Sequence, residues 1–403
     1  MLEVLRAFLQ LGLTSFGGPV AHLGYFRTEF VERRRWLDDA SYADLVALCQ
    51  FLPGPASSQV GMALGLARAG WLGALAAWIG FTLPSAVALI VLAMGMSTGS
   101  GWATSGLVHG LKVAAVAVVA HAVLGMAKSL CPDRMRAGVA VAAALMVLAV
   151  PAAPGQLAAI ALGALAGLCA LRLQPLDSAG HRDPGVSRAA GAALLLVFAA
   201  LLIGLPAVAA ATGSVVAAVA AVFYQAGALV FGGGHVVLPL LQAGVVAPGW
   251  VGNDTFLAGY GAAQAVPGPL FTFAAYLGAA MPPPLGGWVG GFAVLVVLFL
   301  PAFLLVAGAL PFWAAVRPHR AARQAMAGAN AAVVGVLAAA LYDPVWTSAI
   351  RTWQDLGLAL AAFGLLSLGR VSPVLVVAGT ALAASLLQGW PAALPAFSPA
   401  PGP

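Results

Sequence analysis

Two short motifs of proline and glycine interrupt long apolar segments of this chain. Residues 50–55 read Gln-Phe-Leu-Pro-Gly-Pro, and residues 264–269 read Gln-Ala-Val-Pro-Gly-Pro. Corresponding residues of the two motifs are 214 positions apart. Proline lacks a backbone donor and clashes with the preceding helical turn, so neither motif fits inside a regular helix. Each motif therefore predicts that one helix ends and another begins within a few residues.

A helix that begins at Pro55 has the chemistry of an anion site. Proline is favoured in the first helical turn. The first N–H groups of a helix have no partner within it and carry partial positive charge. Hydroxyl and amide side chains adjoin both motifs. The residues interpreted as substrate-binding are Gln50, Pro53, Gly54, Pro55, Ser57, Ser58 and Gln59 around the first motif and Gln264, Pro267, Gly268, Pro269 and Thr272 around the second.

Glycine pairs precede both motifs, as Gly17 and Gly18 in the first half and Gly232 and Gly233 in the second. Small residues let helix backbones approach closely in a membrane, which gives these glycines a packing role. The same close approach suits a backbone that contacts a substrate. Both interpretations stay open.

Among the ionisable residues, Lys112 falls inside or near the mouth of an apolar helix. A lysine at a helix centre costs about 2.5–3.5 kcal/mol on insertion scales. The side chain either extends from the helix end to the interface or faces an oxyanion as a fixed cation; the matching position of the second half is Asn330. His22, His109 and His235 are candidates for a proton relay, against the alternative that each is a packing residue.

No motif indicates an enzyme. The sequence has no His-Glu-x-x-His, no intramembrane aspartate pair and no phosphate-binding loop of the Walker type. Its three cysteines are scattered, without the spacing of metal ligands. We expect no catalytic residues, no metal and no cofactor.

The composition is that of a membrane protein. Of 403 residues, 62% are hydrophobic and 7% are charged, against about 25% charged in soluble domains. Apolar runs of about 20 residues recur and are continuous rather than alternating, which excludes a barrel. The net charge of +6 comes from loop residues that set topology rather than from a nucleic-acid site. We predict an all-α polytopic protein of about 13 transmembrane helices in the lipid bilayer of the cytoplasmic membrane.

The landmarks of the first half recur in the second half in the same order. Phe8, Trp36 and Pro84 match Phe223, Trp250 and Pro301. We expect an N-terminal repeat over 1–172, a linker with a lone transmembrane helix over 173–214, and a C-terminal repeat over 215–403. If each half crosses the membrane six times, the lone helix turns the second half upside down. Two inverted six-helix repeats with broken helices are typical of secondary transporters, with the site near the midplane.

The distribution of basic residues leaves the topology open. If every segment spans, the arginines at 33–35 lie opposite to most others. If the Pro-Gly-Pro segments are re-entrant hairpins, the arginines at 33–35 join the majority, those at 317–323 leave it, and the repeats become parallel. We favour the inverted arrangement.

These motifs resemble those of the chromate transporter superfamily. The resemblance covers nearly the whole chain and rests on residues 16–19 and 36–61 and on their counterparts at 231–234 and 264–269. The length is similar to that of long-chain members, whose halves are taken to be antiparallel. The resemblance implies a secondary transporter that exports chromate, powered by the proton gradient or by anion exchange, and so confers chromate resistance.

The resemblance also has departures and alternatives. Gly234 replaces Pro19, and Leu-Phe at 270–271 replaces Ala-Ser at 56–57, so we expect two unequal half-sites, the first more polar. A carrier of sulfate or another oxyanion and a passive anion channel are alternative functions. A homodimer is also left open.

Overall fold

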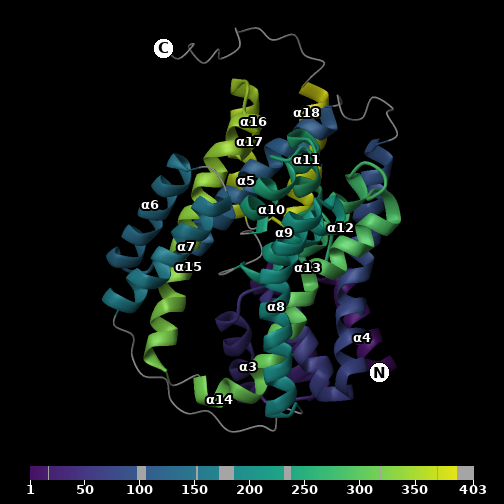
Figure 1. Cartoon of the computed structure of the whole chain (residues 1–403). Helices are drawn as coiled ribbons and strands as arrows, with labels where there is room; N and C mark the ends of the chain where they lie inside the picture. The colour runs from purple at the N-terminus through teal and green to yellow at the C-terminus, as the bar shows by residue number, and fades with distance from the viewer. Residues whose placement is uncertain are drawn as a thin grey trace.

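The computed structural model describes nearly the whole chain, and its described residues are helical, without a strand among them (Figure 1). This confirms the expected all-α class. The described residues are 1–16, 18–97, 106–150, 153–171, 186–230, 237–316, 319–369 and 371–387, and within them the side chains of 20, 97, 153, 154 and 387 are not described.

Both halves consist of long helices and short paired ones. The helices of the first half are α1 (Leu2–Thr14), α2 (Gly18–Arg27), the π-helical η1 (Thr28–Arg33), α3 (Asp39–Phe51), α4 (Ala56–Ser97), α5 (Gly106–Leu130), α6 (Arg134–Ala149) and α7 (Ala153–Ala170). The helix α8 (Arg188–Thr212) stands between the halves. The second half has α9 (Val215–Ala228), α10 (Val237–Val245), α11 (Asn253–Ala263), the 3-10 turn η4 (Leu270–Thr272), α12 (Phe273–Ala280), α13 (Gly287–Ala309), η5 (Leu310–Phe312), α14 (Trp313–Val316), α15 (Arg320–Ala340), η6 (Leu341–Trp346), α16 (Thr347–Ala349), α17 (Trp353–Ser367) and α18 (Pro373–Leu387).

Glu3 at the start of α1 contacts residues from two other segments. Its carboxylate pairs with Arg68 at 3.2 Å and lies 3.9 Å from Arg34. It also accepts a hydrogen bond from the Trp36 indole at 3.2 Å. The start of α1, the residues after η1 and the residues before the turn of α4 therefore lie together. It follows that α1 with α2 and η1 forms one hairpin, and α3 with residues 56–68 forms another.

The sequence predicts a charged loop over residues 25–39, and for residues 25–33 this prediction is wrong. Residues 25–33 are helical, as the end of α2 and η1. Arg34 and Arg33 hold the Glu29 carboxylate at 2.6 and 3.2 Å. These ion pairs neutralise charges that we had assigned to an open loop, so the segment continues the helix instead.

The long element α4 contains a sharp reversal. Ala69 has φ −148°, and Gly70 has φ +63°, a conformation that glycine adopts without steric cost. Gly65 and Gly73 then face each other so closely that a Cβ on either would collide with the backbone of the other. Residues 56–68 and 71–97 are therefore two antiparallel helices. Gly278 and Gly290 make the same close contact between α12 and α13.

The last helix of each half packs against a long helix of the other half. In the first half, Gly110 of α5 lies against Thr380 and Ala384 of α18. In the second half, Gly328 of α15 lies against Gly163 and Gly167 of α7. These contacts relate positions that differ by 217 or 218 residues, so the two interfaces are equivalent. Because neither glycine has a side chain, the helices approach closely.

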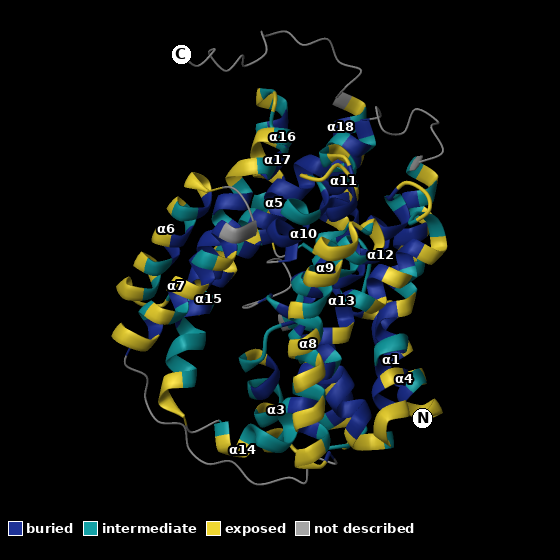
Figure 2. Cartoon of the chain, in the orientation of Figure 1, coloured by how far each residue is buried: buried dark blue, intermediate teal, exposed yellow. Residues whose placement is uncertain are grey.

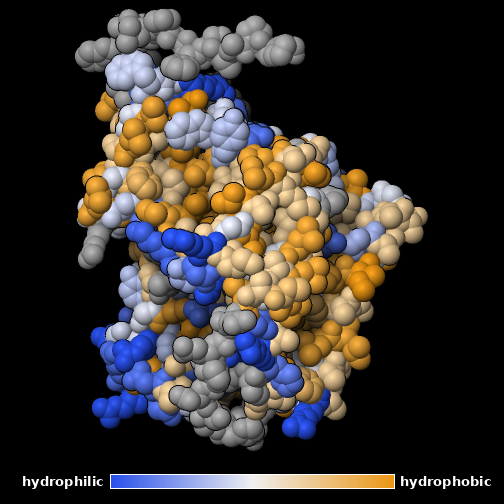
Figure 3. Space-filling model, turned by 90° about the vertical axis from the view of Figure 1, so that its left-hand side faces the viewer, coloured by the Kyte–Doolittle hydropathy of each residue, from blue (hydrophilic) through white to orange (hydrophobic). Residues whose placement is uncertain are grey.

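Five helices of the described chain are long and apolar enough to cross a membrane. They are Ala56–Met96, Gly106–Leu130, Arg188–Thr212, Gly287–Val316 and Arg320–Ala349. The apolar window of α8 has no buried residue, and α8 displays an exposed stripe in Figure 2. Hydrophobic side chains dominate the upper part of one face, and hydrophilic ones gather near its lower edge (Figure 3). The molecule is thus consistent with a membrane protein, whereas the expected count of about 13 spans is not confirmed.

Candidate anion site at the two helix breaks

Both Pro-Gly-Pro motifs break the helices where the sequence predicts. In the first half α3 ends at Phe51 and α4 begins at Ala56. In the second half α11 ends at Ala263 and η4 begins at Leu270. The central glycines have φ +118° at Gly54 and +93° at Gly268, a region that side chains other than glycine rarely adopt. We call residues 52–55 the first tip and residues 264–269 the second tip.

Each tip donates a backbone hydrogen bond to the opposite half. The Gly54 N–H donates to the Val230 carbonyl at 2.6 Å, and the Gly268 N–H donates to the Ser15 carbonyl at 2.8 Å. The donors are 214 positions apart and the acceptors 215 positions apart, so the two bonds are equivalent and crossed. Each break therefore contacts the residues that follow the first helix of the opposite half, far away in the sequence.

The helix after the first tip has the free donors that the sequence predicts. Its first hydrogen bond runs from the Gln59 N–H to the Pro55 carbonyl, at 2.9 Å. The N–H groups of 56–58 precede that bond. At the second tip, the Thr272 N–H already donates to the Pro269 carbonyl at 3.0 Å, so the tighter 3-10 turn uses a donor that the first tip leaves available.

Buried polar side chains surround the first tip. The Ser57 hydroxyl lies 3.4 Å from Nδ1 of His22. The Gln59 amide donates to the Pro53 carbonyl at 2.8 Å. Ser57 and Ser58 are 3% exposed, and Gln59 is fully buried. Of the residues nominated from the sequence, His22, Ser57 and Gln59 thus form one connected set with Pro53 and Gly54.

Several of these buried atoms lack a hydrogen-bond partner. Leaving such a group unsatisfied costs about 1–3 kcal/mol, which makes a bound ligand or water the expected complement. Ser15 and Thr82 belong to this group although the sequence reasoning missed them; a hydroxyl just before the glycine pair and another just before Pro84 were the available signals. In the first half the unpartnered atoms include Ser15 Oγ, His22 Nε2, Ser58 Oγ, Gln59 Oε1 and Thr82 Oγ1.

The second tip has fewer side-chain hydrogen-bond donors available than the first. The Thr272 hydroxyl donates to the Pro269 carbonyl at 2.8 Å, so its proton is already used. The side-chain nitrogen of Gln264 is buried without a partner. Pro267 and Gly268 are half-buried. The second tip therefore contributes an amide and backbone atoms rather than a set of hydroxyls.

Other nominated residues lie away from this set or outside the described chain. The Lys112 ammonium, 5% exposed, pairs with Asp254 at 2.9 Å, where α11 begins. His109 pairs with Asp355 at 2.5 Å, where α17 begins. Both acidic partners were missed from the sequence. Gln50 is exposed at the end of α3, Gly18 begins α2 with φ +78°, and Gly17, Gly232, Gly233 and His235 lie outside the described residues.

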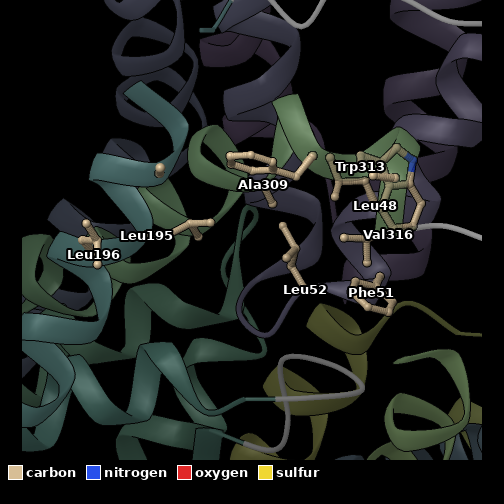
Figure 4. Close-up of a pocket in the computed structure, with 11 residues that line it drawn as sticks. Leu48, Phe51, Leu52, Leu195, Leu196, Ala309, Trp313 and Val316 are labelled. Atoms are coloured by element: carbon tan, nitrogen blue, oxygen red, sulfur yellow. The ribbon is translucent and has the colours of Figure 1, made fainter. Parts of the chain in front are cut away.

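A pocket of about 740 Å³ lies beside the first tip but does not suit an anion (Figure 4). Leu48, Phe51 and Leu52 form one wall, and Leu195 of α8 forms another. The indole nitrogen of Trp313, the one polar side-chain atom among its lining residues, donates to Asp44 at 3.2 Å. A dianion in this apolar lining would lose its hydration without compensation. The apolar lining of this pocket suits lipid rather than an anion.

Crossed helix breaks with facing backbone donors, in a helical protein with long apolar spans, are features of membrane carriers. The sequence profile of the family described as Chromate transporter matches residues 2–168 and 217–385. This chain belongs to the chromate transporter family. The two matched parts coincide with the two halves described above.

Named relatives are similar over most of the chain. A chromate transport protein of Pseudomonas aeruginosa is 29% identical over 96% of this chain and 91% of its own length. A chromate transport protein of Cupriavidus metallidurans is 28% identical over 94% of this chain and 91% of its own. A probable chromate transport protein of Synechococcus elongatus is 27% identical over 77% of this chain and 76% of its own. No solved structure matches the chain.

Proposed function

We propose that this protein is a secondary carrier that exports chromate across the cytoplasmic membrane and thereby confers chromate resistance. Family membership supports the substrate, since relatives similar over nearly the full length are named chromate transport proteins. The observation that carries the proposal is the crossed pair of tip hydrogen bonds beside buried, unpartnered polar atoms. Export is driven by the proton gradient or by exchange for another anion.

The domain organisation is part of the proposal. Residues 1–172 and 215–403 are repeats of one unit, and 173–214 holds the linker and α8. Each repeat contributes two of the five long spans, and α8 adds one more. The chain therefore crosses the membrane three times between a position in the first repeat and the matching position in the second. Because three is odd, the second repeat is inverted. In this arrangement five spans replace the expected count of about 13. The short helices form pairs that enter and leave the membrane on the same face.

Ion pairs and the figure support this inversion. The ends of the first-half hairpins meet at Glu3, beside the N-terminus. The second-half hairpin α11–α12 begins near Asp254, which pairs with α5. The N-terminus and α3 lie at one end of the molecule, and α11 lies toward the other (Figure 1). The sequence predicts parallel repeats if each half has one re-entrant hairpin. Because each half has additional hairpins in this proposal, the repeats are inverted instead.

The tips supply what a dianion needs in a bilayer. Chromate near neutral pH is a tetrahedral dianion, and moving it to mid-membrane without partners is prohibitive. The N–H groups after Pro55, the hydroxyls of Ser57 and Ser58 and the amides of Gln59 and Gln264 provide neutral donors at the positive end of a helix. Neutral donors hold the anion without the trap of a buried ion pair, which suits release in every cycle.

For coupling to protons we nominate His22. It is 1% exposed, and its Nδ1 lies against Ser57 while Nε2 has no partner. His109 is already paired with Asp355. A proton on His22 would partly neutralise an incoming dianion and join proton and anion movement in one site.

The test is flux of radiolabelled chromate in proteoliposomes, with and without a pH gradient and with sulfate as competitor. Acceleration by the gradient indicates proton coupling, and acceleration by anion on the far side indicates exchange. A higher rate for sulfate than for chromate would favour the alternative substrate. Conductive flux that responds to neither gradient nor counter-anion would favour a passive channel and contradict the carrier.

A further inference from the structure

The two tips are equivalent in backbone but not in side chains. In the first half, Ser15, His22 and Thr82 are no more than 1% exposed, and each has an unpartnered polar atom. The positions that match them in the second half, by the spacing of 215 to 217 residues, are Val230, Val237 and Phe299. These three residues are likewise no more than 2% exposed. A polar lining in one half thus corresponds to an apolar lining in the other.

Contacts connect the polar residues into one lining. His22 lies against Ser57 at 3.4 Å, and its ring packs edge-on against Phe81, with centroids 5.2 Å apart. A Cβ on Gly268 would lie 3.0 Å from both the Phe81 carbonyl and the Ser85 hydroxyl. Ser85 in turn donates to the Thr82 carbonyl at 3.1 Å. These contacts extend from Ser57 and His22, past Phe81, to the backbone of the second tip, where the Ser15 carbonyl accepts from Gly268.

Aromatic rings occupy the equivalent position of the second half. Phe271 and Phe273 replace Ser57 and Gln59, and both are buried. The Phe271 ring lies 6.0 Å from Phe299. Phe273 packs against Tyr260 with ring centroids 5.7 Å apart. Such a packed aromatic cluster excludes an ion with its hydration shell and offers it no donors.

We infer that each chain binds one tetrahedral oxyanion rather than two, off the axis that relates the tips, in a lining of the first half that includes Ser15 and Thr82. This inference rests on the proposed function, because it takes the carrier's substrate as the ligand. The second tip contributes its backbone near Gly268, and the Phe271, Phe273 and Phe299 cluster closes the matching second site. One dianion bound near one titratable His22 sets the stoichiometry of a transport cycle.

The test is equilibrium dialysis of radiolabelled chromate with the purified full chain in nanodiscs. We expect one chromate per chain. Thr82→Val, which keeps the shape and removes the hydroxyl, should weaken binding at least tenfold, and Ser15→Ala should act in the same direction. Thr82→Ser should restore most of the affinity, because it restores the hydroxyl. Thr380→Val is the matched control, since that buried hydroxyl on α18 already donates to the Val376 carbonyl at 2.7 Å.

The outcomes separate this inference from the function beneath it. Two chromates per chain, or wild-type affinity in Thr82→Val, would overturn the single off-axis site and leave the carrier function intact. Equal losses in Thr82→Val and Thr82→Ser would show that the shape of threonine matters rather than its hydroxyl, and would also overturn the assignment. If the folded wild-type chain binds neither chromate nor sulfate, the proposed function itself fails.

Discussion

The first and second halves of this protein share a backbone plan and differ in what that plan surrounds. Gly54 and Gly268 have the same left-handed conformation and make equivalent crossed hydrogen bonds. The side chains around them differ, with Ser57 in one half and Phe271 in the other. Backbone geometry was thus retained where the two halves must meet, while polar chemistry was retained on one side. A duplicated architecture does not require a duplicated site.

Backbone changes should therefore be equally severe in both halves. Gly54→Leu and Gly268→Leu each force a side chain into a positive φ, and the new Cβ would lie 2.9 Å from the Gln59 amide or 3.0 Å from the Phe81 carbonyl. We expect both variants to lose chromate flux in proteoliposomes to below a hundredth of wild type. Gly204→Leu on α8 is the control, because a Cβ there meets nothing within 4 Å. Wild-type flux in either tip variant would show that the helix breaks serve the fold and not chromate transport.

Hydroxyl changes should be severe in the first half alone. Removing both hydroxyls in Ser57→Ala/Ser58→Ala should reduce chromate affinity by well over tenfold, since hydrogen bonds to charged groups contribute about 1.5–3 kcal/mol each. Thr272→Val should change affinity by less than threefold, because that hydroxyl already serves Pro269. Ser385→Ala controls for loss of a hydroxyl elsewhere. Equal losses from the serine and threonine variants would erase the distinction between the halves.

The Lys112–Asp254 pair tests whether a charge outside the tips takes part. If Lys112 attracts the anion, Lys112→Gln should weaken chromate binding about tenfold, with Lys112→Arg retaining part of it. Asp254→Asn should then have a smaller effect than Lys112→Gln, because Asp254 is 62% exposed whereas the Lys112 side chain is 5% exposed. Matching losses from both single variants, with no further loss in the double variant, would show that the pair is only structural.

His22 should affect coupling more than binding. The His22→Gln variant should still exchange chromate without a pH gradient, and should lose most of the severalfold stimulation that a gradient gives. The described neighbours of His22 include Ser57, Phe81 and the Ser15 backbone, none of which titrates near neutral pH. The same flux assay at two imposed gradients measures this. Undiminished stimulation would assign the proton to another group.

The sequence predicted local breaks well because proline and glycine act locally. Pro53, Pro55 and Gly54 determine where α3 ends and α4 begins, and the structure has both ends within one or two residues of the prediction. The sequence also predicts that one apolar segment ends near Ala67 and a new helix begins near Gly70, and the structure reverses at Ala69 and Gly70. Ion pairs between distant residues, such as Glu3 with Arg68, hold the end of the helix over 56–68 at the face where α3 begins.

The site was predictable in part for the same reason. Ser57, Ser58 and Gln59 follow the motif directly and could be nominated from spacing. Ser15 and Thr82 lie on other helices, and only tertiary packing reveals that their hydroxyls are buried without partners. Lys112 was nominated for its rarity in an apolar helix, but its partner Asp254 is 142 residues away, beyond what local pattern can reveal.

The proposed carrier consists of two copies of one unit that enter the membrane from opposite faces, each tip bonded to the other half. Single cysteines at Leu37 and Gly252, in a variant with Cys49, Cys131 and Cys169 replaced, test this with a membrane-impermeant maleimide applied to intact cells and to inverted vesicles. Leu37 adjoins the Glu3 cluster, and the exposed Gly252 caps the start of α11. The account predicts that one position is labelled from each face. Labelling of both positions from the same face would contradict it.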